Sequence, residues 1–270
     1  MPYKTLEMFQ EPSPTQVLWR YLNFPKFIDL IQEKSLFFPS LEQLVHDDPW
    51  EGLPSKYNFD PDRLIRVQKT CVATQADGTT DEENIKVQIH QQTARSCFGD
   101  ILENYMKMQK QSALNLRGTF FVNCWHMNKD ESDSQWKIYG DSLYSLAIVT
   151  SFERLRDSIT DYLDIYGAPV LYYYSDQETA EGNAFFSVIH KRWAFVHERE
   201  FRLIHWKPEF IGIRDKPTGI PVIVDLKKLI ESIVVSPRAP NWFKSTVEKF
   251  IKNSGLSIPV SKSSLLDSFV

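Results

Sequence analysis

The segment His197–Arg202 (HEREFR) carries the densest set of side chains that could do chemistry. If this segment is a strand, Glu198, Glu200 and Arg202 share one face, with same-face neighbours about 6.6 Å apart. In a cleft, repulsion between the two carboxylates would raise the pKa of one while the arginine held the other ionised. Such a pair is suited to polarising a hydroxyl or stabilising a cation. The alternative interpretation is a solvated strand edge, whose ion pairs contribute little stability.

Arg20 is a second candidate, because it lies inside the apolar run LWRYL. A charge in such a run is costly unless it is paired or hydrogen-bonded, so we expect an anionic partner. A structural ion pair with Asp48, Glu51 or a carboxylate of the HEREFR segment would satisfy it. A ligand phosphate would do so equally well, since the planar guanidinium suits carboxylate and phosphate alike.

The segment His46–Glu51 (HDDPWE) concentrates acids and an imidazole, and a metal site could be imagined there with His126, His190 or His197. No pair of ligands is spaced at i and i+4 on a helix, however, and Asp-Pro dipeptides usually build turns. We therefore expect no metal site. A metal-dependent nuclease built on Asp47, Asp48 and Glu51 remains a lesser alternative.

Ser132, Trp136 and Tyr139 fall on one face of a short predicted helix. Such an aromatic stripe usually packs into a core. The functional alternative is a platform on which a planar ring stacks, with Asn123 and His126 as polar companions.

Other polar residues are interpreted structurally. Thr150 with Glu153 fits a capping box, so Thr150 is expected to cap a helix. Cys124 lies in an apolar strand without an evident activating base and is expected in the core. Lys191 and Arg192 are expected to be a snorkelling surface pair.

The elements that must position these residues follow from hydrophobic periodicity and capping signals. Strands are predicted at Gln16–Leu22, Leu36–Phe38, Gly118–Trp125, Leu143–Thr150, Ala168–Tyr174, Arg199–Trp206, Ile220–Val224, Ile233–Ser236 and Leu256–Val260. Helices are predicted at Phe24–Ile31, Glu82–Ser112, Ser132–Tyr139, Phe152–Leu163, Leu226–Ser232 and Asn241–Lys252. This order predicts a single α+β domain, a mixed β-sheet with helices packed against it. Residues 1–15 are expected to form an N-terminal arm, and residues 16–270 the domain, with a helical insertion at about 60–115.

Composition narrows the class of protein. The 270 residues are 42% hydrophobic and 24% charged, which is typical of a globular chain and excludes a disordered one. Lys and Arg number 31 against 35 Asp and Glu, giving a net charge of −4. Binding driven by nonspecific attraction to nucleic acid or anionic lipid is therefore not expected. The sequence has no long apolar run, no secretion signal, and three cysteines without a CxxC pair, so we expect a soluble cytoplasmic protein with no membrane partner.

A set of short motifs adds a resemblance to a known family. LWRYLNFPKF, HDDPWEG, VNCWHMNKDESDSQWKIYG, KRWAFVHEREFR and VVSPRAPNWF, in this order, resemble the bacterial family catalogued as domain of unknown function 2971. The resemblance runs from about Gln16 to the C-terminus. It includes the Arg20-Tyr21 pair and the Glu-x-Glu-x-Arg segment, but the family name implies no activity.

A more distant resemblance does imply an activity. Arg20 and Glu198-x-Glu200 are similar, in order and context, to the first and last elements of mono-ADP-ribosyltransferases of the Arg-Ser-Glu class. Their middle Ser-Thr-Ser element is matched only partly, by Thr150-Ser151. The resemblance implies an ADP-ribosyltransferase-like core and NAD as substrate, cleaved through an oxocarbenium-like transition state that the second acid stabilises.

The expected site residues follow from these resemblances. We expect Glu200 and Glu198 to be catalytic, and the contacts with NAD to come from Arg20, Tyr21, Asn123, Trp136, Tyr139 and Arg202. The acceptor is a protein or nucleic acid that the sequence does not identify. The alternative is a noncatalytic module in which the same cleft binds a nucleotide or a protein partner.

Overall fold

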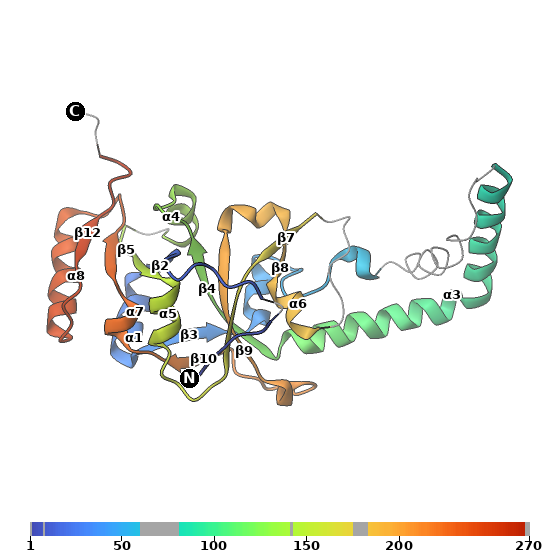
Figure 1. Cartoon of the computed structure of the whole chain (residues 1–270), viewed down its shortest axis with the longest axis horizontal. Helices are drawn as coiled ribbons and strands as arrows, with labels where there is room; N and C mark the ends of the chain where they lie inside the picture. Colours follow the sequence, from blue (N-terminus) through green and yellow to red (C-terminus); the bar gives the residue numbers. More distant parts are fainter. Residues whose placement is uncertain (1, 8, 60–80, 141–142, 175–182, 268–270) are drawn as a thin grey trace.

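A computed structural model describes residues 2–7, 9–59, 81–140, 143–174 and 183–267. The described chain has mixed helical and strand content built around one large sheet (Figure 1), which confirms the predicted α+β class. Of the expected insertion, residues 60–80 lie outside the described residues. The rest belongs to helix α3 (Asp81–Arg117), which reaches from the predicted helical start to the beginning of the next strand.

The large sheet has eight strands in the described part of the chain. Their spatial order is β1 (Tyr3–Lys4), β6 (Ile165–Pro169), β9 (Glu200–Trp206), β4 (Phe120–Met127), β2 (Val17–Asn23), β5 (Ser145–Ser151), β11 (Ser232–Val235) and β12 (Val260–Lys262). Neighbours are antiparallel except at the two edges, where β1 pairs with β6 and β11 with β12 in parallel. The sheet is therefore mixed, as predicted.

Two small sheets flank the large one. Strand β3 (Ser35–Pro39) pairs antiparallel with β10 (Gly219–Ile223), and β7 (Leu171–Tyr173) pairs in parallel with β8 (His190–Arg192). Four short 3₁₀ helices connect these elements in the described chain: η1 (Leu41–His46), η2 (Lys56–Phe59), η3 (Trp193–Glu198) and η4 (Pro208–Phe210).

Helices cover both faces of the large sheet. The main core lies under α1 (Phe24–Glu33), α5 (Phe152–Ser158), α7 (Leu226–Leu229) and α8 (Asn241–Asn253), against strand residues such as Leu18, Phe121 and Phe201. On the opposite face, α6 (Ala184–Ile189) packs on Val122 and Ile204, and α4 (Asp133–Tyr139) packs on Trp19 and Tyr21. Alternate side chains of β2, β4 and β9 thus enter different cores, as the strand period of two requires.

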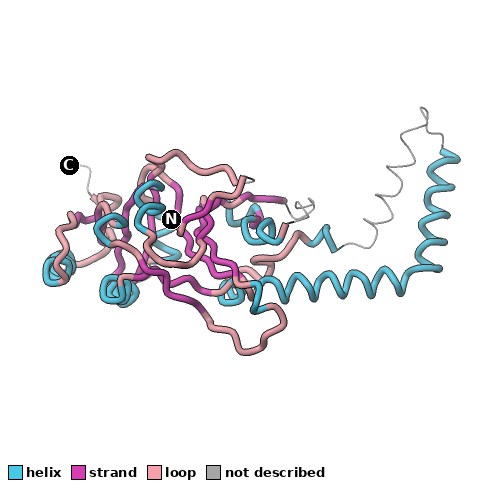
Figure 2. The backbone as a smooth tube through the Cα atoms, turned by 60° about the horizontal axis from the view of Figure 1, so that its bottom comes forward, coloured by secondary structure: helices cyan, strands magenta, loops and turns pink. Residues whose placement is uncertain are grey.

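Helix α3 extends away from this layered body (Figure 1). The tube in Figure 2, seen from a different direction, shows the same projection of the helix beyond the sheet and its covering helices. Its C-terminal end leads directly into β4, so α3 is anchored to the domain at the strand that later carries Cys124 and His126.

The N-terminal residues contribute to the sheet. Tyr3 and Lys4 pair with Ile165 and Tyr166 as edge strand β1, and Phe9 is buried in the core under α6. The expected arm is therefore folded against the domain.

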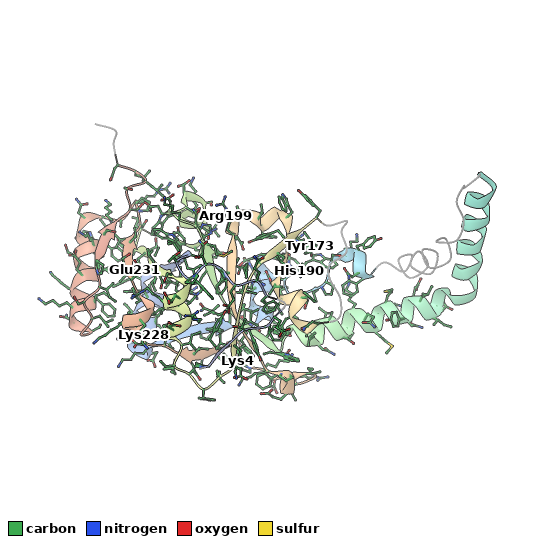
Figure 3. The ribbon with its side chains drawn as sticks, viewed as in Figure 1. Lys4, Tyr173, His190, Arg199, Lys228 and Glu231 are labelled. Atoms are coloured by element: carbon green, nitrogen blue, oxygen red, sulfur yellow. The ribbon has the colours of Figure 1, made fainter. Side chains whose placement is uncertain are left out.

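Several local predictions are corrected. Glu198 does not share a strand face with Glu200 and Arg202, as was expected: it ends η3, and Arg199, with a φ of 39°, turns the chain into β9, which begins at Glu200 (Figure 3). The cap of α5 is Ser151, whose side chain accepts a hydrogen bond from the Arg154 N–H, and not Thr150. The last predicted strand lies later in the chain, at Val260–Lys262.

The sheet is split at one place. Strand β2 pairs with β5 along its whole length, from Val17 to Asn23, but with β4 only at Leu18↔Met127 and Trp19↔His126. After these two residue pairs the strands separate, and Arg20 is the first residue of β2 at the gap.

Candidate functional site

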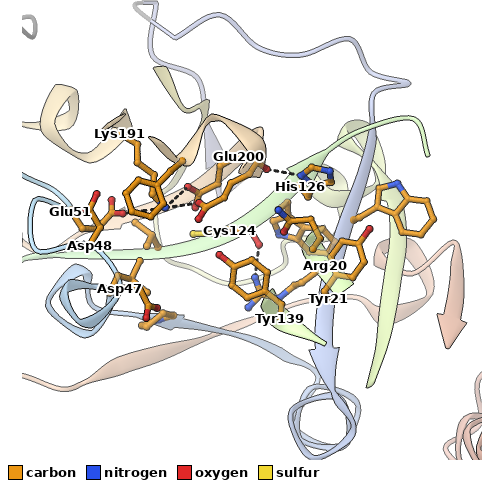
Figure 4. Close-up of a pocket in the computed structure, with 18 of the residues that line it drawn as sticks. Arg20, Tyr21, Asp47, Asp48, Glu51, Cys124, His126, Tyr139, Lys191 and Glu200 are labelled. Carbon is orange, nitrogen blue, oxygen red and sulfur yellow. Dashed lines mark hydrogen bonds and ion pairs between the residues drawn. The ribbon is translucent and has the colours of Figure 1, made fainter. Parts of the chain in front are cut away.

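A cavity of about 230 Å³ lies where β2 and β4 separate (Figure 4). Its walls come from both strands, from α4 and from the segment that includes β8, η3 and the start of β9. Carboxylates gather at one end, and Arg20 lies at the other. The cavity therefore has an acidic end and a cationic end.

The acidic end is organised around a buried ammonium group. The Nζ atom of Lys191 lies 2.5 Å from a carboxylate oxygen of Glu198, 3.4 Å from one of Glu51 and 3.6 Å from one of Glu200. Arg202 joins two of the same acids, at 2.7 Å from Glu51 and 2.8 Å from Glu200. All five side chains are at most 10% exposed. We call this set the charge cluster.

Within the charge cluster, the pKa values of Glu198 and Glu200 are shifted in opposite directions. Burial alone would raise the pKa of Glu200, but the charges of Arg202 and Lys191 lower it to about 2. Burial raises the pKa of Glu198, and the charge of Glu200 adds to that rise. Burial alone would lower the pKa of Lys191, whereas the surrounding carboxylates raise it above its ordinary value. One ionised carboxylate thus lies beside one that protonates more readily, although Glu198 and Glu200 do not share the strand face from which that division was predicted.

Lys191 and Arg192 are not the surface pair that the sequence predicted. Lys191 is buried in the charge cluster, and Arg192 donates to the buried carboxylate of Asp48, with Nη2 2.5 Å from Oδ1. The prediction was wrong because burial here depends on the pairing of β8 with β7 and on acids distant in the sequence, Asp48 and Glu51.

Of the two alternatives for Arg20, the structural ion pair with Asp48, Glu51 or a carboxylate of the HEREFR segment is not found among the described residues. Arg20 Nη1 donates to Asn123 Oδ1 at 3.0 Å and to the Cys124 carbonyl oxygen at 2.7 Å, and the guanidinium lies 5.8 Å from the centre of the Trp125 ring. Among the described residues, Arg20 makes no ion pair, since Asp48 pairs with Arg192 instead. Its charge is available to a ligand anion, although burial lowers its pKa.

Two further residues of β4 border the acidic end. Burial, helped by the charge of Glu200, raises the pKa of the Cys124 thiol well above its ordinary value, so it stays protonated and is not a nucleophile. His126 pairs across the sheet with Glu200, and its Nδ1 lies 2.6 Å from the Glu198 carbonyl oxygen. Burial lowers the pKa of His126, so the ring is neutral near pH 7.

The predicted catalytic and ligand-binding residues divide into two groups. Arg20, Tyr21, Tyr139, Glu198 and Glu200 line the cavity. The others, Asn123, Trp136 and Arg202, lie behind its wall.

The side chains behind the wall act as supports. Asn123 donates to the Phe37 carbonyl oxygen at 2.9 Å and accepts from Arg20. Trp136 packs against Tyr21 and donates to Glu131, while fully buried Arg202 holds Glu200. We therefore assign these three predicted contacts to positioning and not to ligand binding.

Sequence analysis missed Gln135 as a site residue. It lines the cavity from α4, one helical turn before Tyr139. Gln135 and Tyr139 are spaced at i and i+4, which places them on the same face of the helix and could have identified Gln135 from the sequence. The interpretation considered only the face of Ser132, Trp136 and Tyr139.

The alternative of a metal-dependent nuclease receives no support from the segment His46–Glu51. His46 and Asp47 are largely exposed, while Asp48 and Glu51 are occupied by ion pairs with Arg192 and with the charge cluster. Within the described ranges, no three His, Cys, Asp or Glu side chains are arranged to hold a metal ion. None of the helices described is long and apolar enough to cross a membrane.

Comparisons with known proteins do not place the chain in a family. A scan against protein-family models, a search of curated proteins and a search of solved structures each found no match. Function is therefore inferred from the side chains of the cavity.

Removing the central cation should destabilise the protein strongly. In Lys191→Met, three buried carboxylates would share a single cation, and we expect the free energy of unfolding to fall by about 3–5 kcal/mol. The matched substitution Lys107→Met, on the exposed surface of α3, should change it by less than about 0.5 kcal/mol. Urea unfolding measures both. Equal stability of the two variants would contradict a structural role for Lys191.

The depressed pKa of Glu200 predicts a pH dependence with a definite sign. Because the folded pKa of about 2 lies below the ordinary 4.5, the ionised group stabilises the fold above pH 4.5, and this contribution is lost as the pH falls from 4.5 to 2. At about 1.4 kcal/mol per unit of pKa, it amounts to roughly 3 kcal/mol. The stability difference between wild type and Glu200→Gln should therefore shrink over that range. A stability difference between the two proteins that stays constant from pH 4.5 down to pH 2 would contradict the lowered pKa of Glu200.

Proposed function

We propose that the protein cleaves the N-glycosidic bond between nicotinamide and ribose in NAD, as an ADP-ribosyltransferase-like enzyme or an NAD glycohydrolase. The observation that carries the proposal is the presence in one cavity of an ionised buried carboxylate, Glu200, and a cation, Arg20, that makes no ion pair within the described chain. The carboxylate of Glu200 would stabilise a developing positive charge, and the guanidinium of Arg20 would bind a phosphate or ribose oxygen.

Glu200 would stabilise the transition state. As the bond from ribose C1′ to nicotinamide breaks, the electron pair moves to the pyridine nitrogen and positive charge develops on the ribose. A carboxylate that is already ionised and held in place needs little reorganisation to stabilise that charge. Both ion pairs of Glu200 use Oε2, which leaves Oε1 outside the salt bridges.

Glu198 would act on the acceptor. An incoming hydroxyl, from water or from a macromolecule, forms the new bond to C1′ and loses its proton. A carboxylate with a raised pKa is the better base for that proton, and Glu198 has this property beside Glu200. Glu198 would therefore act as the base both in hydrolysis and in transfer to an acceptor. The acceptor in the transfer reaction would be a protein or a nucleic acid.

The size of the cavity limits what it encloses. Its volume of about 230 Å³ is below the roughly 300–1,000 Å³ of typical small-molecule pockets. We infer that it takes the nicotinamide and its ribose, while the rest of NAD lies at the mouth. Exposed Tyr139 at this rim is placed to stack on a planar ring.

A noncatalytic module that binds a nucleotide or a protein partner is the second candidate. It is favoured by one observation: Glu200 is almost fully buried and is held by two cations, as a purely structural carboxylate would be. The resemblance to domain of unknown function 2971 is compatible with either candidate.

A cytoplasmic location, where NAD is available, remains part of the proposal that the protein cleaves NAD. It rests on the cysteine pattern.

The substitution Glu200→Gln separates the two candidates. It keeps the size of the side chain but removes its charge, so we expect the kcat for nicotinamide release from NAD to fall about a hundredfold or more, with NAD affinity largely retained. The control Glu209→Gln, on an exposed 3₁₀ helix, should leave kcat unchanged. Wild-type protein that releases no nicotinamide above a blank, even with cell lysate as a source of acceptors, would exclude the enzyme in favour of the noncatalytic module.

Arg20→Ala should have the complementary effect. Removing the guanidinium takes away the cationic end of the cavity, so the Kd for NAD should rise by about tenfold or more, with a smaller change in kcat at saturating NAD. Calorimetric titration with NAD measures this, and Arg238→Ala, on the exposed surface, is the matched control. Unchanged NAD affinity in Arg20→Ala would show that Arg20 is structural only.

A further inference from the structure

Three buried polar atoms of residues that line the cavity have no partner in the described structure: Arg20 Nε, His126 Nε2 and Gln135 Nε2. His126 and Gln135 are 5% and 2% exposed as whole residues. A buried polar atom without a hydrogen bond is costly, and folded proteins hold few of them. Three of the eight such atoms among the described residues belong to the lining of this one cavity, where a ligand could complete their hydrogen bonds.

The bonding of His126 fixes what its free nitrogen can do. Nδ1 lies 2.6 Å from the carbonyl oxygen of Glu198, and a carbonyl oxygen can only accept, so Nδ1 carries the proton. In a neutral ring, Nε2 then has a lone pair and no hydrogen. His126 therefore offers an acceptor to the cavity.

Gln135 offers the opposite group. Its side-chain nitrogen is an amide donor, presented from α4, whereas His126 lies on β4 of the sheet. Aromatic rings adjoin both residues: the Tyr21 ring centre lies 6.3 Å from that of His126, and Tyr139 follows Gln135 on the same helical face. A flat ligand that carries one donor and one acceptor would complement these two groups.

We propose that His126 and Gln135 bind a primary carboxamide attached to a planar ring. The carboxamide N–H would donate to His126 Nε2, and its oxygen would accept from Gln135 Nε2. Under the proposed function, on which the identity of the ring rests, this group is the carboxamide of nicotinamide, and the two residues determine specificity for it. The acid analogue, nicotinate, has no N–H to donate to His126 Nε2.

The first test compares two probes on the full-length wild-type chain. Calorimetric titration with nicotinamide and with nicotinate should give an affinity at least tenfold higher for nicotinamide, since a site built to hydrogen-bond an N–H discriminates against an analogue that lacks it. Because this arm needs no variant, it does not depend on how a substitution affects folding. Equal affinities, or a preference for nicotinate, would overturn the proposal.

The second test removes one hydrogen bond. Gln135→Leu should weaken nicotinamide binding roughly tenfold, as expected for one lost hydrogen bond in a buried site. Gln111→Leu, on the exposed part of α3, is the matched control and should bind as wild type does. Thermal melts check that both variants fold, and Gln135→Met serves as a second variant of similar length. Unchanged affinity in a folded Gln135 variant would overturn the proposal.

The third test uses adenosine, because the amino edge of adenine also presents a hydrogen-bond donor beside an acceptor on a planar ring. Adenosine should bind more weakly than nicotinamide, and its affinity should be insensitive to Gln135→Leu. Adenosine binding that is tighter and depends on Gln135 would assign the pair to adenine and overturn the carboxamide.

These binding tests can fail or succeed independently of the test for NAD cleavage. Nicotinamide binding that depends on Gln135, in a protein that does not cleave NAD, would support the carboxamide site and exclude the enzyme. NAD cleavage with a KM and a nicotinamide affinity that Gln135→Leu leaves unchanged would support the enzyme and overturn the carboxamide site.

Discussion

The buried ammonium group of Lys191 is the interaction on which the rest of the site depends. It lies among three carboxylates: Glu51 from the turn between η1 and η2, Glu198 from η3 and Glu200 from β9. Without this cation and Arg202, three negative charges would share a nearly water-free space, and at least one would have to become protonated. The cluster therefore does two things at once. It ties the segment before α3 to β8 and β9, and it keeps Glu200 ionised at the cavity wall.

The cationic end of the cavity arises from a different constraint, the incomplete pairing of β2 with β4. Because only two residue pairs join these strands, the Cys124 carbonyl oxygen at the gap is free to accept a hydrogen bond from Arg20. Asn123 accepts a second hydrogen bond from the same guanidinium nitrogen. These neutral acceptors orient the guanidinium without cancelling its charge, which a carboxylate partner would do. The split in the sheet thus creates the cavity and leaves a cation on its wall.

Local patterns in the sequence predicted the scaffold better than the site. Strands β2, β4 and β9 were predicted within a few residues because alternation and apolar runs are local signals. Glu198 was misplaced because the 3₁₀ helix and the left-handed Arg199 before β9 have no strong local signature. The ion pair of Lys191 with Glu51 and the neutral partners of Arg20 join residues more than 100 positions apart, which no periodicity reveals. Gln135 escaped notice because the aromatic residues beside it dominated the interpretation of α4.

The central claim is that Glu200 is ionised because Lys191 and Arg202 hold it so. The most direct measurement is the pKa of the Glu200 carboxyl group itself, followed by carbon-detected NMR of side-chain-labelled protein through an acid titration, with Glu200→Gln to assign the signal. We expect a pKa near 2 in the wild-type protein and a clearly higher one in Lys191→Met. A wild-type pKa at or above the ordinary 4.5, or one that Lys191→Met leaves unchanged, would contradict the account.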